Sequence, residues 1–311
     1  MRGLILAGGL ATRLRPLTQV TNKHLLPVYN KPMIFYPLES IIKSGLKEIL
    51  ILSSSDHAGH FANLLGSGDQ FGLRLYYVIQ DNPKGGIANA ISLAEEFAGG
   101  QNLLVVLGDN IFGYDLKPAV EYFDKKEKGA MVFGVKMPTE SKQYGVIEMD
   151  NHGKVLSIEE KPEHPKSDIA QTGIYMYDNR VFDFVRNLKP SQRGELEVTD
   201  LNNHYLKEGT LECRLIDWWI DAGTSHDELL RANNMVAEKI AKIKEKIKTS
   251  RGYNREAYKK ELAKAESGLI QELLSLKILD PAMGSGHFLV EAVDFLAHEL
   301  NGAMSGESLE R

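Results

Sequence analysis

The chain has 311 residues, of which 43% are hydrophobic and 25% are charged, and its formal net charge is −5. This composition predicts a soluble globular protein. No run of eighteen apolar residues occurs, which excludes a membrane-spanning helix, and the first residues lack the features of a signal peptide. The single cysteine, Cys213, excludes an internal disulfide bond, so a reducing cytoplasm is the expected location.

The first 235 residues alternate short apolar runs with stretches of helical periodicity. The apolar runs are typical of parallel strands covered on both faces, and they are "GLILAGG", "EILILSSS", "LYYVIQ" and "LLVVLGDN". The helical stretches include "MIFYPLESIIKSG" and "GIANAISLAEEFAG", the second of which ends on a glycine. We therefore predict an α/β, Rossmann-like fold in which a mostly parallel open sheet carries helices on both faces.

From about residue 130 the pattern changes to shorter strands and turns. The segment "MDNHGKV" places an asparagine and a glycine between two alternating runs, which predicts a β-hairpin. We interpret this region as a small antiparallel extension of the same domain.

A basic segment follows the strand-rich region. Residues 238–264 hold ten basic and four acidic side chains, a charge of +6, which leaves −11 for the rest of the chain. Apolar residues spaced by four, three and four from Val236 to Ile247 predict an amphipathic helix, and helical periodicity resumes over 255–276. The predicted divisions are a domain over 1–237, a basic helical linker over 238–276 and a C-terminal segment over 277–311.

A Gly-rich turn follows the first predicted strand, in "LILAGGLATRLRPLT". Glycines such as Gly8 and Gly9 let the backbone approach a phosphate closely, and successive N–H groups bind anions. Arg13 adds a permanent positive charge whose geometry suits phosphate oxygens, and Lys23 is a second cation close behind. A tight turn with surface arginines is the alternative interpretation of this segment.

Two carboxylates also follow apolar runs, Asp109 in "LLVVLGDN" and Asp221 in "DWWIDAGT". In open α/β sheets the carboxyl ends of the strands line the ligand crevice, and Mg²⁺ prefers carboxylate, water and phosphate oxygens. A phosphate-binding turn, cations and an acidic metal site are together the parts needed for phosphoryl or nucleotidyl transfer. Taken singly, each aspartate also fits the role of a helix or turn cap.

The chain resembles the glucose-1-phosphate thymidylyltransferases over residues 1 to about 237. The blocks that carry the resemblance are, in order, "LILAGGLATRLRPLT", "NKHLLPVYNKPMIFYPLE", "VVLGDNIF", "YGVIEMD", "IEEKP", "TGIYMYD", "RGELEVTDLNNHYL" and "WWIDAGTSHDELLRANN". The "RGELEVTD" block favours this branch over other sugar nucleotidyltransferases. The resemblance implies a Mg²⁺-dependent enzyme, expected to be a homo-oligomer, that makes dTDP-glucose and pyrophosphate from dTTP and glucose 1-phosphate.

The resemblance also implies a role for individual residues. Arg13 and Lys23 are the implied catalytic residues, which neutralise the triphosphate and the charge that develops at the α-phosphorus. The implied nucleotide-binding residues are Gly8, Gly9, Thr12, Gln80, Gly86 and Asp109. The implied sugar-phosphate site consists of Tyr144, Gly145, Glu160, Lys161 and Thr172, and the implied Mg²⁺ ligands are Asp109 and Asp221. Catalysis would then be mostly positioning and charge neutralisation in an in-line displacement.

The sequence departs from the family pattern at two positions of the nucleotide site. The family loop usually has a glycine where this chain has Ala11, and the usual glutamine after the catalytic lysine is His24 here. A uridylyltransferase that uses UTP is an alternative within the same class. A nucleotide-sugar-binding protein without turnover is an alternative from another class.

Near the end of the chain, "LKILDPAMGSGHFLVEAVDFLA" (276–297) resembles the first motif of adenine-specific DNA methyltransferases, where a Gly-rich loop wraps S-adenosylmethionine. The Asn/Asp-Pro-Pro-aromatic segment that such enzymes need does not occur in the sequence. We interpret the segment as a fragment without its own activity, and a DNA methyltransferase as the alternative function. A helix is expected over "FLVEAVDFLAHEL", and neither nucleic acid nor a membrane is an expected partner.

Overall fold

The computed structural model describes residues 1–266 except 10, 83, 138–140, 192 and 251. The chain divides into two units, Met1–Leu262 and Ala263–Arg311, and the first holds the sheet and the helices that cover it. The methyltransferase-like motif and the helix expected after it lie outside the described residues. Among the described residues, no helix is long and apolar enough to cross a membrane.

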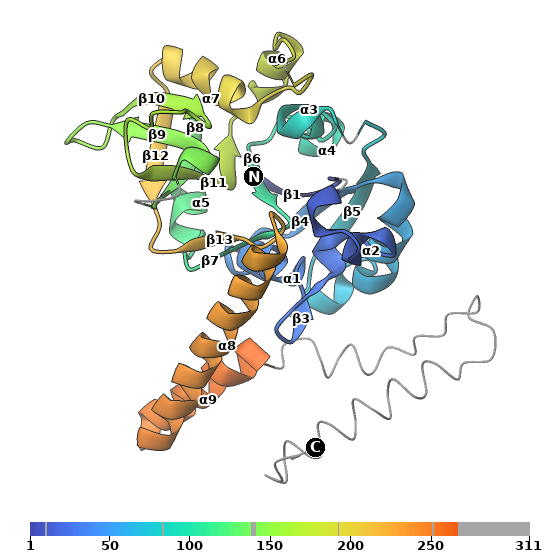
Figure 1. The fold of residues 1–311 in the computed structure, drawn as a ribbon, viewed down its shortest axis with the longest axis vertical. Coiled ribbons are helices and arrows are strands. Elements are labelled where there is room, and N and C mark those ends of the chain that lie inside the picture. The colour runs from blue at the N-terminus through green and yellow to red at the C-terminus, as the bar shows by residue number, and fades with distance from the viewer. Residues whose placement is uncertain (10, 83, 138–140, 192, 251, 267–311) are drawn as a thin grey trace. The chain divides into compact units, whose positions relative to one another are not determined.

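A parallel sheet forms the centre of the fold (Figure 1). Its strands, in spatial order, are β6 (Leu103–Leu107), β1 (Arg2–Ala7), β4 (Glu48–Ser53) and β5 (Arg74–Ile79). Leu4 and Ile5 of β1 point to opposite faces, and both are fully buried, because helices cover the sheet on each side. The parallel sheet predicted from the apolar runs is confirmed.

Helices cover both faces of this sheet, as predicted. The helices of the main domain are α1 (Phe35–Lys43), α2 (Ala58–Leu65), α3 (Gly86–Ser92), α4 (Glu95–Ala98), α5 (Lys117–Phe123), α6 (Val181–Arg186) and α7 (Val198–Lys207). Ile91 of α3 packs in one core cluster with Leu4, whereas Ile41 of α1 lies against Gly3 on the other face. The helix predicted over 86–99 is two helices, and the second stops at Gly99 in a left-handed conformation, as expected of a terminal glycine.

An antiparallel extension continues the sheet, as predicted. Its antiparallel strands are β8 (Ala130–Lys136), β9 (Gly145–Met149), β10 (Val155–Glu160) and β11 (Ile169–Tyr177), and β12 (Leu211–Leu215) adds to β8 in the parallel sense. The long strand β11 pairs antiparallel with β6 and so joins the extension to the parallel sheet. The predicted hairpin is β9–β10, and Gly153 takes a positive φ of 81° in its turn.

Two short ribbons complete the main domain. Strand β2 (Pro27–Val28) pairs with β3 (Lys31–Pro32), and β7 (Asn110–Phe112) pairs antiparallel with β13 (Trp219–Asp221). The second ribbon sets Asp221 opposite Asn110, the residue after Asp109. Two aspartates that are far apart in the sequence therefore come to the same edge of the sheet.

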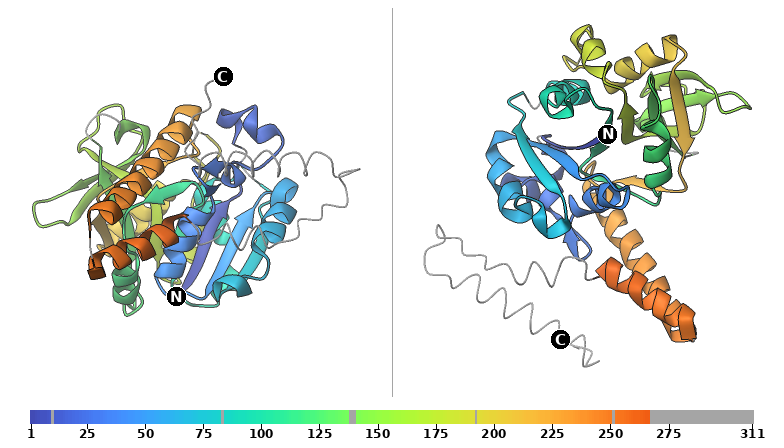
Figure 2. Two further views of the ribbon diagram at one scale, coloured as in Figure 1. Left: turned by 90° about the horizontal axis from the view of Figure 1, so that it is seen from below. Right: turned by 180° about the vertical axis from the view of Figure 1, so that it is seen from behind.

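Helix α8 (His226–Thr249) leaves this ribbon and is followed by α9 (Gly252–Glu266) (Figure 2). Ser225 caps α8, because its side chain accepts a hydrogen bond from the N–H of Glu228. Ile240 is buried in α8, in agreement with the predicted apolar stripe. The boundary predicted near residue 237 lies inside this continuous helix, so the family-like region and the basic segment share it.

Candidate active site

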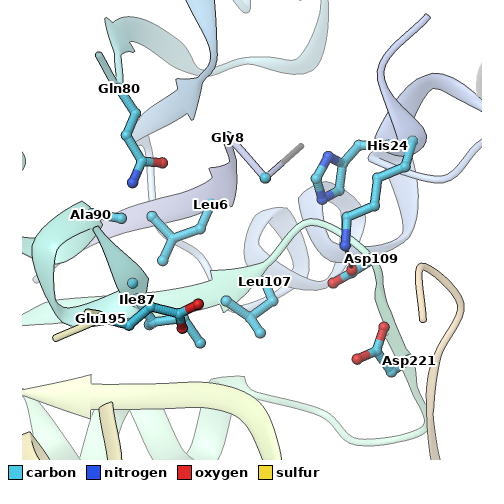
Figure 3. Close-up of a pocket in the computed structure, with 13 residues that line it drawn as sticks. Leu6, Gly8, His24, Gln80, Ile87, Ala90, Leu107, Asp109, Glu195 and Asp221 are labelled. Carbon is cyan, nitrogen blue, oxygen red and sulfur yellow. Dashed lines mark hydrogen bonds and ion pairs between the residues drawn. The ribbon is translucent and has the colours of Figure 1, made fainter. Parts of the chain in front are cut away.

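Two adjoining cavities open at the carboxyl ends of the parallel strands. The first has a volume of about 260 Å³ and the second about 200 Å³. They share Ile87, Leu107, Glu195 and Asp221 in their walls, so one continuous site is formed. In Figure 3, Gln80 lies at one end of the first cavity, and Asp109 and Asp221 lie at the other.

The first cavity contains most of the predicted nucleotide-binding residues. Gly8, Gly9, Gln80, Gly86 and Asp109 all line it. The Gln80 side chain packs so closely against Gly8 that a Cβ atom there would collide with it. Gly86 has a positive φ of 85°, and a Cβ atom would lie 2.5 Å from the carbonyl oxygen of Leu196. Glycine is therefore required at Gly86, where a Cβ atom would meet backbone atoms, whereas at Gly8 a Cβ atom would displace the Gln80 side chain.

A cation and two carboxylates meet at the other end of this cavity. The Lys23 ammonium forms an ion pair with Asp109, which is 4% exposed. Burial is the largest single influence and raises the pKa of Asp109. The charge of Lys23, together with His24, the hydrogen bond from Lys23 and a backbone hydrogen bond, outweighs burial and holds this pKa well below its usual range. Burial lowers the pKa of Lys23, yet Asp109 and Asp221 outweigh it and raise that pKa above its ordinary value.

The pKa of Asp221 shows that Lys23 only partly neutralises the negative charge of the two aspartates. Burial, together with the negative charge of Asp109, raises the pKa of Asp221 to about 7. Its carboxylate also accepts a hydrogen bond of 3.2 Å from the N–H of Gly223. The buried Asp109 and the partly buried Asp221 are hard oxygen ligands, and one lysine leaves their combined negative charge only partly neutralised. The residues present therefore fit a divalent cation such as Mg²⁺.

His24 has a defined orientation beside this group. The Asn22 amide donates to the carbonyl of Ala7 at 3.1 Å, so its oxygen faces His24 and lies 2.6 Å from Nδ1. Nδ1 must therefore carry the proton in this contact. Burial and the charge of Lys23 lower the pKa of His24 to about 3, so the ring is neutral. A glutamine was the family pattern here, and the cavity wall accepts a neutral imidazole instead.

The second cavity is lined by all the predicted sugar-phosphate residues, namely Tyr144, Gly145, Glu160, Lys161 and Thr172. Thr199 donates a hydrogen bond of 2.7 Å to Oε2 of Glu160, which fixes that carboxylate. The other oxygen, Oε1, lies 3.7 Å from the Lys161 ammonium and 3.7 Å from the Arg193 guanidinium. Cations and hydroxyl acceptors thus face the same space, as a sugar phosphate requires.

Two predicted residues lie outside both linings. Thr12 and Arg13 are exposed on a short 3-10 helix, Thr12–Leu14, that begins after Ala11 in a left-handed conformation. The positive charge of Arg13 nevertheless lowers the pKa of Lys23 in part, so it acts on the cavity from its rim. The structure therefore brings Lys23 to the two aspartates and leaves Arg13 outside the lining of either cavity.

Several lining residues were missed by the sequence interpretation. They are Arg193, Glu195 and Glu197 in the second cavity, with Tyr175 and Trp219. The charged cluster "RGELE" was a usable signal for the first three, because it combines opposite charges in a Gly-containing loop. Trp219 carried no comparable signal, since its position depends on the pairing of β13 with β7.

The chain is similar to known proteins over most of its length. The family described as "Nucleotidyl transferase" matches residues 2–239. A glucose-1-phosphate thymidylyltransferase of Neisseria gonorrhoeae is 46% identical over 228 residues, covering 72% of this chain and 78% of that protein. A second, from Actinoplanes, is 46% identical over 231 residues, covering 73% of this chain and 75% of that protein.

Solved structures give the same result. A Bacillus anthracis protein described as a glucose-1-phosphate thymidylyltransferase, in complex with sucrose, superposes with a TM-score of 0.71 at 46% identity and covers 76% of this chain and 94% of its own. A UDP-glucose pyrophosphorylase in complex with UDP-glucose superposes with a TM-score of 0.66 at 25% identity and covers 76% of this chain and 98% of its own.

Proposed function

Because the chain belongs to the nucleotidyl transferase family, we propose that it transfers a thymidylyl group from dTTP to glucose 1-phosphate, giving dTDP-glucose and pyrophosphate. The observation that carries this proposal is the junction of two cavities at one group of charges, Lys23, Asp109 and Asp221. Relatives named for this activity, at 42% to 46% identity, support the thymidylyl donor over UTP.

In the proposed reaction, the first cavity binds the nucleotide. The Gln80 amide has both donor and acceptor atoms for a base edge, and the backbone at Gly8 and Gly9 approaches the phosphates. Lys23 is already charged and lies inside this cavity, so it is placed to neutralise phosphate oxygens. Arg13 at the rim adds a second cation for the β- and γ-phosphates.

The second cavity orients the sugar phosphate. Glu160 accepts hydrogen bonds from sugar hydroxyls through the oxygen that Thr199 leaves free, and Lys161 pairs with the phosphate. A phosphate oxygen of the sugar phosphate is already an anion, so the attack on the α-phosphorus needs little proton transfer. The bond from the α-phosphorus to the bridging oxygen of the leaving pyrophosphate breaks as the new bond forms. The protein contributes mainly alignment and charge neutralisation.

Asp109 and Asp221 would hold the Mg²⁺ ion of this reaction. When bound, Mg²⁺ supplies positive charge to the reacting phosphate oxygens. A homo-oligomeric state and a cytoplasmic location, both predicted from the sequence, belong to this proposal, as does the division of the chain into a catalytic domain, a linker and a C-terminal segment.

The test is pyrophosphate release by the full chain with a matrix of nucleotides and sugar phosphates in the presence of Mg²⁺. The proposed pair, dTTP with glucose 1-phosphate, is expected to give the highest kcat/KM. A higher value with UTP would identify a uridylyltransferase. If no pair of substrates gives pyrophosphate release but the protein still binds dTDP-glucose, the chain is a binding protein and not a transferase.

A further inference from the structure

One fully buried amide connects the two cavities. Asn110 is 0% exposed and is part of the wall of neither cavity. It begins β7 directly after Asp109, and its partner across the ribbon is Asp221. A polar side chain without any exposure is costly unless its hydrogen bonds are made, so its partners indicate why it is there.

The orientation of this amide is fixed by its neighbours. Its oxygen accepts a hydrogen bond of 2.8 Å from the N–H of Gly173 and one of 2.5 Å from the indole N–H of Trp219. Because both neighbours can only donate there, the amide nitrogen must face the other way. That nitrogen lies 3.1 Å from Oδ1 of Asp109 and donates to it.

The close fit extends to the strand behind the amide. A Cβ atom on Gly173 would lie 2.5 Å from the Asn110 oxygen, so the backbone of β11 can approach only because this residue is glycine. The amide is thus held from β11 and from β13, and it acts on a carboxylate whose other oxygen faces Lys23.

We propose that Asn110 is a positioning residue for the metal site, which orients the Asp109 carboxylate towards Asp221 so that the pair binds a divalent cation. The inference rests on the proposed function, in which these aspartates are metal ligands. Hydrogen bonds to a ligating carboxylate fix its direction, and their loss typically lowers metal affinity or activity by about 10- to 100-fold. Asn110 is fully buried and lines neither cavity, so its effect on the site passes through Asp109.

The chain offers a matched control in Asn202. This asparagine is also 0% exposed, accepts a hydrogen bond of 2.7 Å from the Tyr177 hydroxyl and donates one of 3.2 Å to Gln171. It lies in the lining of neither cavity, and its side-chain hydrogen bonds join it to Tyr177 and Gln171 rather than to Asp109 or Asp221. Replacing either asparagine removes a buried amide, but only one of the two changes concerns the metal ligands.

The test measures Mn²⁺ binding to the full chain without nucleotide, by electron paramagnetic resonance, beside the melting temperature. Asn110→Ala is expected to weaken Mn²⁺ binding by about tenfold or more, while Asn202→Ala stays within about twofold of wild type although both variants melt earlier. If Asn110→Ala does not fold, Asn110→Ser is measured in its place against the same thresholds.

Two results would overturn the inference. Mn²⁺ affinity within about twofold of wild type in the Asn110 variant would reduce this residue to a structural role. Equal losses in both asparagine variants would attribute the effect to general loosening of the domain. These results are distinguishable from a failure of the proposed function, in which the wild type itself would neither bind Mn²⁺ nor release pyrophosphate.

Discussion

The ammonium group of Lys23 forms an ion pair with the carboxylate of Asp109, and both side chains are largely buried. The lysine thereby occupies one of the oxygens that a metal ion needs. In the protein without nucleotide, a divalent cation must compete with this ammonium. When nucleotide phosphates are present, they offer Lys23 another anion, and Asp109 becomes available to the metal.

The first prediction follows from this competition. Lys23→Met should bind Mn²⁺ more tightly than wild type in the absence of nucleotide, by about tenfold, because Asp109 then lacks its ion-pair partner and Asp221 loses a nearby positive charge. Turnover should fall at the same time. The control is Lys31→Met, which removes another buried lysine. The Lys31 ammonium lies 2.6 Å from Oε1 of Glu39, and neither residue lines a cavity of the site. Unchanged or weaker Mn²⁺ binding in Lys23→Met would contradict the competition.

The second prediction concerns Asp221 and pH. Its pKa of about 7 means that this carboxyl group is partly protonated at neutral pH before a cation arrives. Metal binding requires the ionised form, so it should release a proton and should weaken by up to about tenfold for each pH unit below 7. Calorimetric titration with Mn²⁺ in buffers of different ionisation enthalpy measures the released proton.

The Asp221→Asn variant provides the control for this pH dependence. It should bind Mn²⁺ weakly and should lose the change of affinity around pH 7, because the titrating group is gone. A wild-type pH profile in Asp221→Asn would assign the proton to another group and would remove Asp221 from the metal site.

The third prediction separates Arg13 from the sugar-phosphate site. Arg13→Ala should lower kcat by about 10- to 100-fold, because a guanidinium aimed at the reacting phosphates stabilises the transition state more than the ground state. The KM for glucose 1-phosphate should stay within about twofold of wild type. Arg15→Ala is the matched control, since Arg15 is also exposed but lines a neighbouring pocket with Thr18 and His57, which adjoins the first cavity only at Gly9. If Arg13→Ala and Arg15→Ala lower kcat equally, the effect is a general attraction of the arginines for the substrate phosphates, and Arg13 has no specific role at the reacting phosphates.

Local patterns predicted much of this fold. Strand β1 could be predicted because "GLILAGG" is apolar on both faces, and the end of α4 because Gly99 accepts a left-handed conformation. The break between α3 and α4 could not, since continuous helical periodicity runs through Leu93 and Ala94.

The site likewise contains residues that the sequence predicted and residues that it did not. Asp109 was predictable from its place after a buried strand, whereas Asn110 was not, because its bond to Trp219 joins residues 109 positions apart. The exposed position of Arg13 was likewise hidden, since it depends on the turn that Ala11 starts. Pairings distant in the sequence and loop conformations therefore account for what the sequence alone did not predict.

The fourth prediction concerns the C-terminal segment. Deletion of residues 277–311 should leave the rate of pyrophosphate release within about twofold of the full chain, because both cavities are built from residues before 222. Calorimetric titration of the full chain with S-adenosylmethionine should show no binding. Micromolar binding that disappears on deletion would instead identify the Gly-rich motif as a working site.

The last prediction uses the buried histidine as a probe of stability. The pKa of His24 is about 3 in the folded chain, against about 6.5 for an ordinary histidine, mainly because burial and then the charge of Lys23 oppose protonation, while Asp109 partly favours it. Between these two pH values the unfolded chain holds one more proton than the folded chain. Acid therefore favours unfolding, and the stability contributed by neutral His24 is lost as the pH falls below 6.5.

The measurement is the free energy of unfolding in urea at pH 7 and at pH 5. Wild type should lose about 1 to 2 kcal/mol more than His24→Gln over this interval, since the glutamine does not titrate and a full proton corresponds to about 1.4 kcal/mol per pH unit. The other titrating groups are common to both proteins and cancel in the comparison. His164→Gln, which replaces an exposed histidine, should keep the wild-type pH dependence. If His24→Gln also keeps the wild-type pH dependence of the unfolding free energy, then the ring of His24 is protonated in the folded protein at pH 5. The contact with Asn22 then does not hold the ring in its neutral form.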